Sequence, residues 1–283
     1  MKLALACLLA FPAAALAAQH GPVFGYATPV NSQGEASFDT GLIIRYCPAG
    51  SQLTSSSVFG YGITPHITVN AVVPFTFSKN TLPETRISGG GEFAASASWR
   101  FQHSVTSVGK RIESTATLGL IVPGPQSDSG VLANLHRAPG IAATVASGFA
   151  SRSQYLWFGG GYTRFMELQH DRRPDTISFS TVYGYRPAKL RRTYDQWDYR
   201  GFAELTGEHT GNVIAAGLRI PATSTTTLWL GPSVLAIFKN VAVEGGIQGP
   251  LFRNVPQQTY GRESLRIAIN ISYLKYSAHT STH

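Results

Sequence analysis

The stretch "HITVNAVVPFTFS", residues 66–78, alternates between two kinds of side chain for almost its whole length. One face carries Ile67, Val69, Ala71, Val73, Phe75 and Phe77. The opposite face carries the polar residues His66, Thr68, Asn70 and Thr76. Period two is typical of a β-strand. In a soluble sandwich the aliphatic face would be buried, whereas in a membrane barrel it would face lipid and the polar face would line the interior.

The same alternation recurs along the chain, for example in "ASFDTGLIIRY" (36–46), "EFAASASWRFQ" (92–102) and "SLRIAINISY" (264–273), while helical periodicity is almost absent. About twelve strands are predicted, near residues 36–46, 53–63, 65–77, 91–102, 111–122, 140–149, 153–165, 176–187, 197–208, 225–237, 240–251 and 263–275. Their length matches the roughly 9 to 11 residues that a tilted strand needs to cross a bilayer.

The predicted connections alternate between short and long. Short ones fall at 63–66, 150–153 and 238–240, and longer ones at 78–90, 123–139, 166–175, 209–224 and 252–262. Outer-membrane barrels have this arrangement, with their short turns in the periplasm. "NVIAAGLRI", 212–220, could form a further strand and spoil the even count; we interpret it as loop.

The first residues, "MKLALACLLAFPAAALA", are typical of a secretory signal peptide that is cleaved after about Ala17. The remaining chain keeps one cysteine, Cys47, so no internal disulfide is expected. Without Lys2 it has 22 basic and 15 acidic residues, a net charge of +7. On an exported chain this favours an anionic surface or anionic solutes over nucleic acid as partners. Charged residues are only 13% of the sequence, and no later segment has the roughly 20 apolar residues of a spanning helix.

We therefore predict an all-β fold, a single transmembrane antiparallel up-and-down β-barrel of about 12 strands over residues 36–276. Residues 18–35 would be a pre-barrel segment that hangs in the periplasm or folds into the lumen as a plug, and 277–283 a disordered tail. Charged residues on the polar faces are predicted to line the lumen: Asp39, Arg45, Arg100, Glu113, Arg200, Glu204, Glu244 and Arg266. Aromatic residues near strand ends are predicted to form the interfacial girdles: Trp99, Phe101, Tyr155, Trp157, Phe165, Tyr185 and Trp229.

The last third of the chain resembles a known family. "DQWDYRGFAELTGEHTG" (195–211), "TTTLWLGPSVLAIFKNVAVEGGIQGPLF" (225–252) and "ESLRIAINISYLKY" (263–276) resemble the closing strands of the outer-membrane family named for the meta pathway of phenol degradation. "GYGITPHITVNAVVPF" (60–75) looks like an early hairpin of the same group. The resemblance implies an outer-membrane transporter, with hydrophobic or aromatic compounds as cargo.

No enzymatic or metal site is predicted. The eight histidines are scattered without the spacing of a zinc site, so we expect no metal and no cofactor. His103 and Ser104 are adjacent, and adjacent strand residues point apart instead of forming a nucleophile–base hydrogen bond. The glycine triplets at 89–91 and 159–161 lack the following helix of a phosphate-binding loop. The second triplet predicts a bend in the barrel wall or the close approach of a lumen element.

These observations predict a channel in the bacterial outer membrane through which small molecules diffuse passively. Its expected partners are outer-membrane lipids and lipopolysaccharide, small-molecule solutes and the barrel-assembly machinery, with no nucleic acid. Two alternatives stay open at this point. One is a barrel that transports nothing and acts as a structural or surface-binding protein, and the other is a soluble secreted β-sandwich.

Overall fold

The computed structural model describes residues 21–28, 30–47, 50–80, 89–90, 92–124, 137–191, 195–255 and 263–275. The predicted signal peptide and tail lie outside these ranges. The long strands are β1 (Ala36–Cys47), β2 (Gly50–Thr64), β3 (Ile67–Asn80), β5 (Phe93–Ser107), β6 (Lys110–Val122), β7 (Gly140–Ala150), β8 (Gln154–Phe165), β9 (Thr176–Tyr185), β10 (Asp198–Thr210), β13 (Thr225–Phe238), β14 (Val241–Asn254) and β15 (Leu265–Lys275). The short elements are β4 (Gly89–Gly90), β11 (Ile214–Ala215), β12 (Leu218–Arg219) and the 3-10 helix η4 (Ala188–Leu190). Within the described ranges, no helix is long and apolar enough to cross a membrane.

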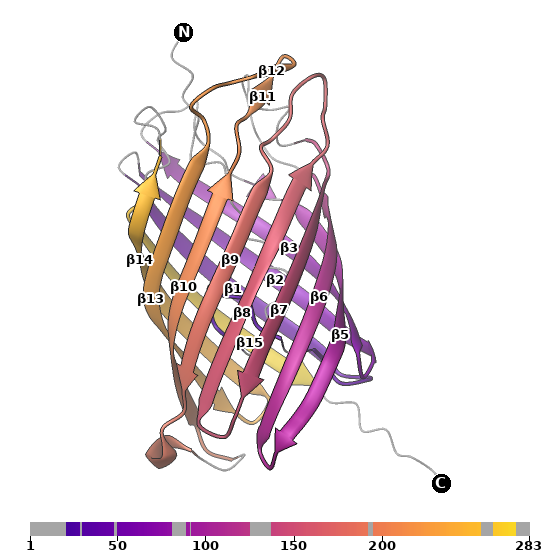
Figure 1. Ribbon diagram of the computed structural model, residues 1–283, viewed down its shortest axis with the longest axis vertical. Helices are drawn as coiled ribbons and strands as arrows, with labels where there is room; N and C mark the ends of the chain where they lie inside the picture. Colours follow the sequence, from indigo (N-terminus) through magenta and orange to yellow (C-terminus); the bar gives the residue numbers. More distant parts are fainter. Residues whose placement is uncertain are drawn as a thin grey trace.

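The twelve long strands that the structure describes close into one antiparallel up-and-down barrel (Figure 1). Neighbours in sequence are neighbours in the barrel, and the first strand pairs with the last, from Ala36 opposite Lys275 to Tyr46 opposite Leu265. The predicted fold class is therefore confirmed. β4 only extends the edge of β3, and β11 and β12 form a separate small hairpin. Residues 212–220 thus add no strand to the barrel, and the even count is kept.

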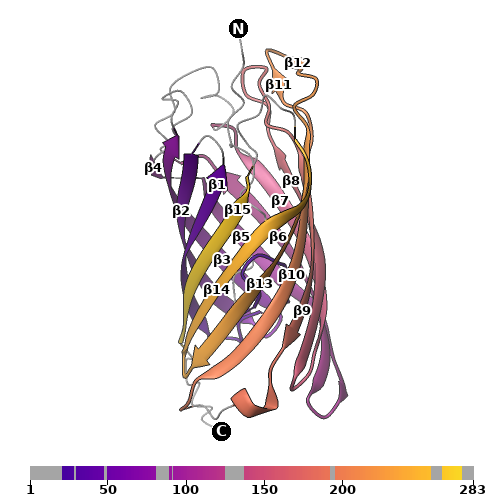
Figure 2. The same ribbon diagram turned by 90° about the vertical axis from the view of Figure 1, so that its left-hand side faces the viewer.

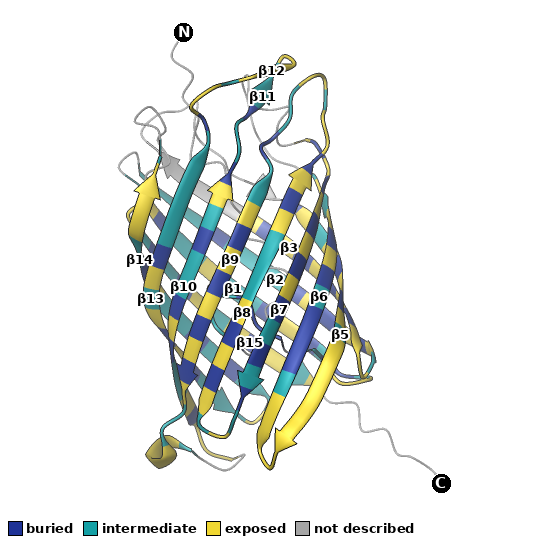
Figure 3. Cartoon of the chain, in the orientation of Figure 1, coloured by how far each residue is buried: buried dark blue, intermediate teal, exposed yellow. Residues whose placement is uncertain are grey.

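The apolar faces of the strands point outward. On β3, Val69, Val73 and Phe75 are exposed, whereas Thr68 and Asn70 are buried. Figure 3 shows the same alternation of exposed and buried residues on the strands facing the viewer. Because the aliphatic rows lie outside a closed cylinder, the soluble-sandwich alternative is wrong. The exposed apolar surface is the one that lipid covers in a membrane barrel.

The connections follow the predicted alternation with two departures. Residues 65–66, 108–109, 151–153 and 239–240 make short turns at one end, and 166–175 and 211–224 are among the longer loops at the other. The β1–β2 connection at 48–49 is short although it lies at the long-loop end. The β9–β10 connection, 186–197, is long although it lies at the short-turn end, where it contains η4. Ala36 and Lys275 are paired at the short-turn end, so the barrel starts and finishes on what is the periplasmic side of such proteins.

If the apolar side chains on the outer face contact lipid, a charge placed among them should destabilise the protein. Val145 lies in the middle of β7 and is 54% exposed, whereas Val108, which is 87% exposed, lies in the turn between β5 and β6. Val145→Arg should destabilise the lipid-inserted protein by about 2 to 4 kcal/mol, because it places a charge near the bilayer midplane. Val108→Arg makes the same change outside the hydrocarbon and should cost roughly 0 to 1 kcal/mol. Urea unfolding in lipid vesicles measures both, and equal losses would contradict the assigned outer face.

Candidate functional site

The lumen-facing side of the strands carries the charged residues singled out in the sequence. The buried ones are Asp39, Arg45, Glu113, Glu204, Glu244 and Arg266, and the partly buried ones are Arg100 and Arg200. Since the outer face of the barrel is exposed, burial here means that a side chain points inward. The structure distributes these residues over separate groups at different heights of the barrel, and most acidic groups have a basic partner.

Two ion-pair groups lie toward the short-turn end. Asp198 at the start of β10 receives Arg186 Nε at 2.7 Å and Arg200 Nε at 3.2 Å. Glu113 on β6 contacts Arg100 at 3.5 Å and Arg111 at 3.2 Å. In both groups one carboxylate lies between two guanidinium groups, so opposite charges compensate each other where water is limited.

A third group lies toward the long-loop end. Arg45 on β1 and Arg266 on β15 are directly opposite each other, which would be repulsive without a counter-charge. Glu263, just before β15, supplies the counter-charge. Its carboxylate lies 2.6 Å from Arg266 Nε and 3.8 Å from Arg45 Nε. The Arg266 guanidinium also lies 4.0 Å from the ring centre of Trp229. Burial alone would raise the pKa of Glu263, but the two arginines outweigh it and hold the pKa below its usual range.

The segment before β1, residues 21–35, lies inside the barrel (Figure 2). It is held mostly by side chains of the wall. Asn31 N–H donates to Thr68 Oγ1 at 3.0 Å, and Tyr26 N–H donates to Ser180 Oγ at 2.7 Å. The Tyr26 hydroxyl is 2.6 Å from Ser178 Oγ. The segment therefore crosses the lumen from the β3 side to the β9 side.

Glu204, in the middle of β10, is the main acceptor for this segment. One carboxylate oxygen accepts from Val23 N–H at 3.0 Å, and the other from Phe24 N–H and Gly25 N–H, each at 2.8 Å. Ser233 Oγ also donates to the carboxylate. Three backbone donors that would otherwise be buried without partners are thus satisfied by one fully buried side chain.

The second glycine triplet makes room for the segment. A Cβ on Gly159 would lie 2.8 Å from Tyr26 Cβ, and one on Gly161 would lie 2.5 Å from the Tyr26 hydroxyl. Both glycines are in β8, whose inner face at this height is covered by Tyr26. The sequence predicted either a bend in the wall or the close approach of a lumen element at this triplet. These contacts fit the close approach of a lumen element.

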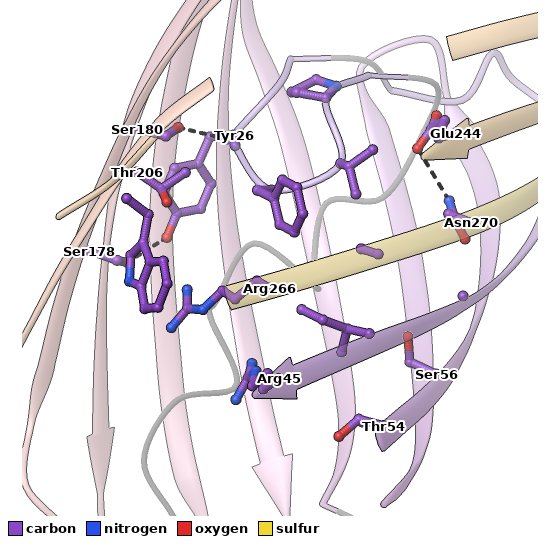
Figure 4. A pocket seen from close by; sticks show the side chains of 18 of the residues that line it. Tyr26, Arg45, Thr54, Ser56, Ser178, Ser180, Thr206, Glu244, Arg266 and Asn270 are labelled. Atoms are coloured by element: carbon purple, nitrogen blue, oxygen red, sulfur yellow. Dashed lines mark hydrogen bonds between the residues drawn. The ribbon is translucent and has the colours of Figure 1, made fainter. Parts of the chain in front are cut away.

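A cavity of about 140 Å³ lies beside this segment and is lined by residues of β1, β2, β9, β10, β13, β14 and β15 (Figure 4). Phe24, Val58 and Trp229 contribute apolar surface to it. Polar side chains line the rest, among them Asp39, Arg45, Glu208, Glu244, Arg266 and Asn270. The cavity thus offers both signs of charge and an apolar wall to a small solute.

Four of the predicted girdle residues face the lumen instead of the lipid. Trp99, Phe101 and Tyr185 are exposed on the outer face, but the other four are buried: Tyr155, Trp157, Phe165 and Trp229. The reason is strand parity, because Leu156 and Phe158 take the outer positions of β8. Tyr155 and Trp157 stack inside with ring centres 5.3 Å apart. Phe165 lies 3.7 Å under the Arg173 guanidinium, and Trp229 under that of Arg266.

Several lumen and outer-face residues were missed by the sequence reasoning. Exposed aromatic residues at the short-turn end are Tyr61, Trp197, Tyr199 and Tyr273. Glu208 has the same parity as Glu204 on β10, so the alternation alone could have identified it. Glu263 and Arg173 lie outside the strands, and no periodic signal points to them. Glu92, the buried partner of Arg173, has the parity of Arg100 in the alternating stretch 92–102, so the alternation alone could have identified it.

The Glu263 interactions predict a specific dependence of stability on pH. Its folded-state pKa lies below the ordinary 4.5, so its stabilising contribution is fully present above pH 4.5 and is lost as the pH falls through the folded value. Urea unfolding between about pH 3 and pH 6 should show a smaller acid loss for Glu263→Gln than for the wild type. Glu167→Gln, which changes a largely exposed loop carboxylate, is the matched control and should behave like the wild type. Identical pH profiles for all three proteins would contradict the assignment.

No family model matches the chain, and no curated protein sequence matches it. Solved structures do. An outer-membrane channel from Pseudomonas putida F1 superimposes with a TM-score of 0.66 at 12% identity, over 91% of this chain and 100% of the other. The NanC porin gives a TM-score of 0.52 at 8% identity, over 83% of this chain and 98% of the other. At such identities the likeness establishes the fold alone, and the meta-pathway family stays a prediction. With its apolar outer face, the chain is a bacterial outer-membrane β-barrel that shares the fold of channels and porins.

Proposed function

We propose that this barrel is a passive diffusion channel for small molecules, and that residues 21–35 narrow its lumen. The observation that carries the proposal is how this segment is held. Its residues 23–26 are bound by side chains of Glu204 and Ser180 and take no part in the strand ladder of the wall. Such an attachment can be released without opening the barrel.

The lining supports passage of polar solutes past this segment. Side chains of both signs, among them Glu244, Arg45 and Arg266, line the cavity on the inner wall. Side chains of opposite sign across a narrow lumen create a transverse field that orients polar or amphipathic solutes, and the narrowing excludes large ones. With no energy-coupling segment recognised in the sequence, transport would run down a concentration gradient.

The proposed cargo includes hydrophobic or aromatic compounds. The family resemblance implies this class, and the aromatic side chains of Phe24 and Trp229 line the cavity in the lumen. The partners proposed with this function are lipid and lipopolysaccharide around the apolar outer face, small-molecule solutes inside, and the barrel-assembly machinery during insertion. An enzymatic role is not part of the proposal.

Single-channel recording in planar bilayers tests the proposal. Glu204→Ala removes the acceptor of three backbone N–H groups, and unsatisfied buried donors cost about 1 to 3 kcal/mol each. We expect Glu204→Ala to raise the mean conductance roughly two-fold or more over the wild type, because the segment leaves the lumen more often. Ser180→Ala, which removes the acceptor of Tyr26 N–H, should shift the conductance in the same direction by less.

Glu208→Ala is the matched control, since Glu208 faces the lumen from the same strand but accepts no hydrogen bond from residues 21–35 among the contacts described. Heat-modifiable gel migration checks that each variant is a folded barrel. If none of the folded proteins shows conductance steps, the channel function is contradicted and the alternative of a structural or surface-binding barrel is favoured. Equal conductance of the wild type and Glu204→Ala would contradict the narrowing role.

A further inference from the structure

Two lumen carboxylates, Asp39 and Glu244, lie on either side of β15. Asp39 on β1 is opposite Ser272, and Glu244 on β14 is opposite Asn270, so the four residues share one inner face of three adjacent strands. Asp39 is 2% exposed and Glu244 is 4% exposed. Figure 4 shows Glu244 and Asn270 at the edge of the cavity beside residues 21–26.

These carboxylates are not compensated by the residues around them. Neither oxygen of Asp39 has a well-formed hydrogen bond, although Ser272 is its neighbour across the ladder, and Oε1 of Glu244 has none either. Glu244 receives a 3.4 Å contact from Asn270 Nδ2 on its other oxygen, and Gly21 N–H also hydrogen-bonds its carboxylate. Within the described ranges, no lysine, arginine or histidine forms an ion pair with Asp39 or Glu244, and Glu204 adds a further negative charge nearby.

The other buried lumen acids differ from this pair. Glu113, Asp198, Glu92 and Glu263 each contact at least one arginine, and Glu204 accepts three backbone N–H groups. A buried carboxylate without such a partner is strongly unfavourable. The Asp39–Glu244 pair therefore differs from these acids, because no basic side chain of the described lumen lies within ion-pair distance of it.

The unfilled acceptors indicate what kind of cation fits. Asp39 and Glu244 both line a cavity of about 140 Å³ that also has apolar surface from Phe24, and neither has a basic partner within ion-pair distance among the described residues. A primary ammonium group is compact and has three N–H donors. We propose that the Asp39–Glu244 pair binds a primary ammonium group inside the barrel.

The ammonium group has two possible sources. The first is the chain itself: Gly21 N–H hydrogen-bonds Glu244, and cleavage after Ala17 would create an α-amino group only three residues earlier, a reach of about 10 Å. The second is an ammonium-bearing solute in the lumen, a source that rests on the proposed channel function. Both supply the same chemistry, and the two arms of the experiment distinguish them.

The first arm measures protection of the α-amino group in the full mature protein purified from outer membranes. An amine-reactive acylating reagent is applied near neutral pH, and the N-terminal peptide is followed by mass spectrometry, which also reports where the chain begins. If the chain's own amine is bound, it should react about tenfold more slowly than in the Asp39→Asn, Glu244→Gln double variant, as for a stabilisation of about 1.4 kcal/mol. Glu167→Gln, which changes an exposed loop carboxylate that does not line the cavity, should match the wild type.

The second arm measures thermal unfolding in detergent with methylammonium or tetramethylammonium chloride at equal ionic strength. If a solute is the source, methylammonium should raise the Tm of the wild type and not that of the double variant. Tetramethylammonium, which has no N–H donor, should have no such effect. Neither arm depends on conductance, so a barrel that fails to conduct can still pass this test.

The outcomes are distinct. Protection of the α-amino group assigns the site to the chain's own terminus, whereas fast labelling together with a methylammonium-dependent rise in Tm assigns it to a solute. Fast labelling with no effect of methylammonium would overturn the proposal. If the double variant does not fold by heat-modifiable migration, the labelling rate of the wild type is compared with that of the same protein unfolded in urea. A rate equal to the unfolded one, again with no methylammonium effect, overturns the proposal without any variant.

Discussion

The structure depends on the pairing of β1 with β15. In hydrocarbon no water is available for backbone N–H and C=O groups, so an open sheet edge would leave a row of them without partners. The ladder from Ala36 opposite Lys275 to Tyr46 opposite Leu265 removes that edge. Closure then determines the two faces. The outer face must be apolar because it meets lipid, and the polar side chains are forced into an interior that the chain has to neutralise itself.

The interior is neutralised by local groups instead of one network. Arg45 and Arg266 are forced opposite each other by the register of β1 and β15, and Glu263 from the adjoining loop lies between them. At the other end, Asp198 takes the same position between Arg186 and Arg200. In both groups the geometry of the ladder places charges at fixed spacings, and the counter-charge comes from a loop or a strand end, where the backbone is free of the ladder.

The strands could be predicted from the sequence because period two is a property of each strand alone. The alternation in residues 66–78 also predicted correctly that Thr68 and Asn70 share a face, but only closure decides that this face is the inside. The girdle prediction failed for Tyr155 and Trp157 because aromatic identity was given more weight than parity. Leu156 between them takes the lipid-facing position, and strict alternation would have placed both rings in the lumen. Contacts made by loop residues could not be predicted, since they depend on which strands the closed barrel brings together.

The wall and the segment inside it differ in how their backbone N–H and C=O groups are satisfied. Wall strands are joined by continuous backbone ladders, whose loss would expose many polar groups to lipid at once. Residues 23–26 have no ladder, and their N–H groups are satisfied by the side chains of Glu204 and Ser180. The segment is therefore attached to the wall by side chains, and its release would break these contacts without breaking the ladders that close the barrel.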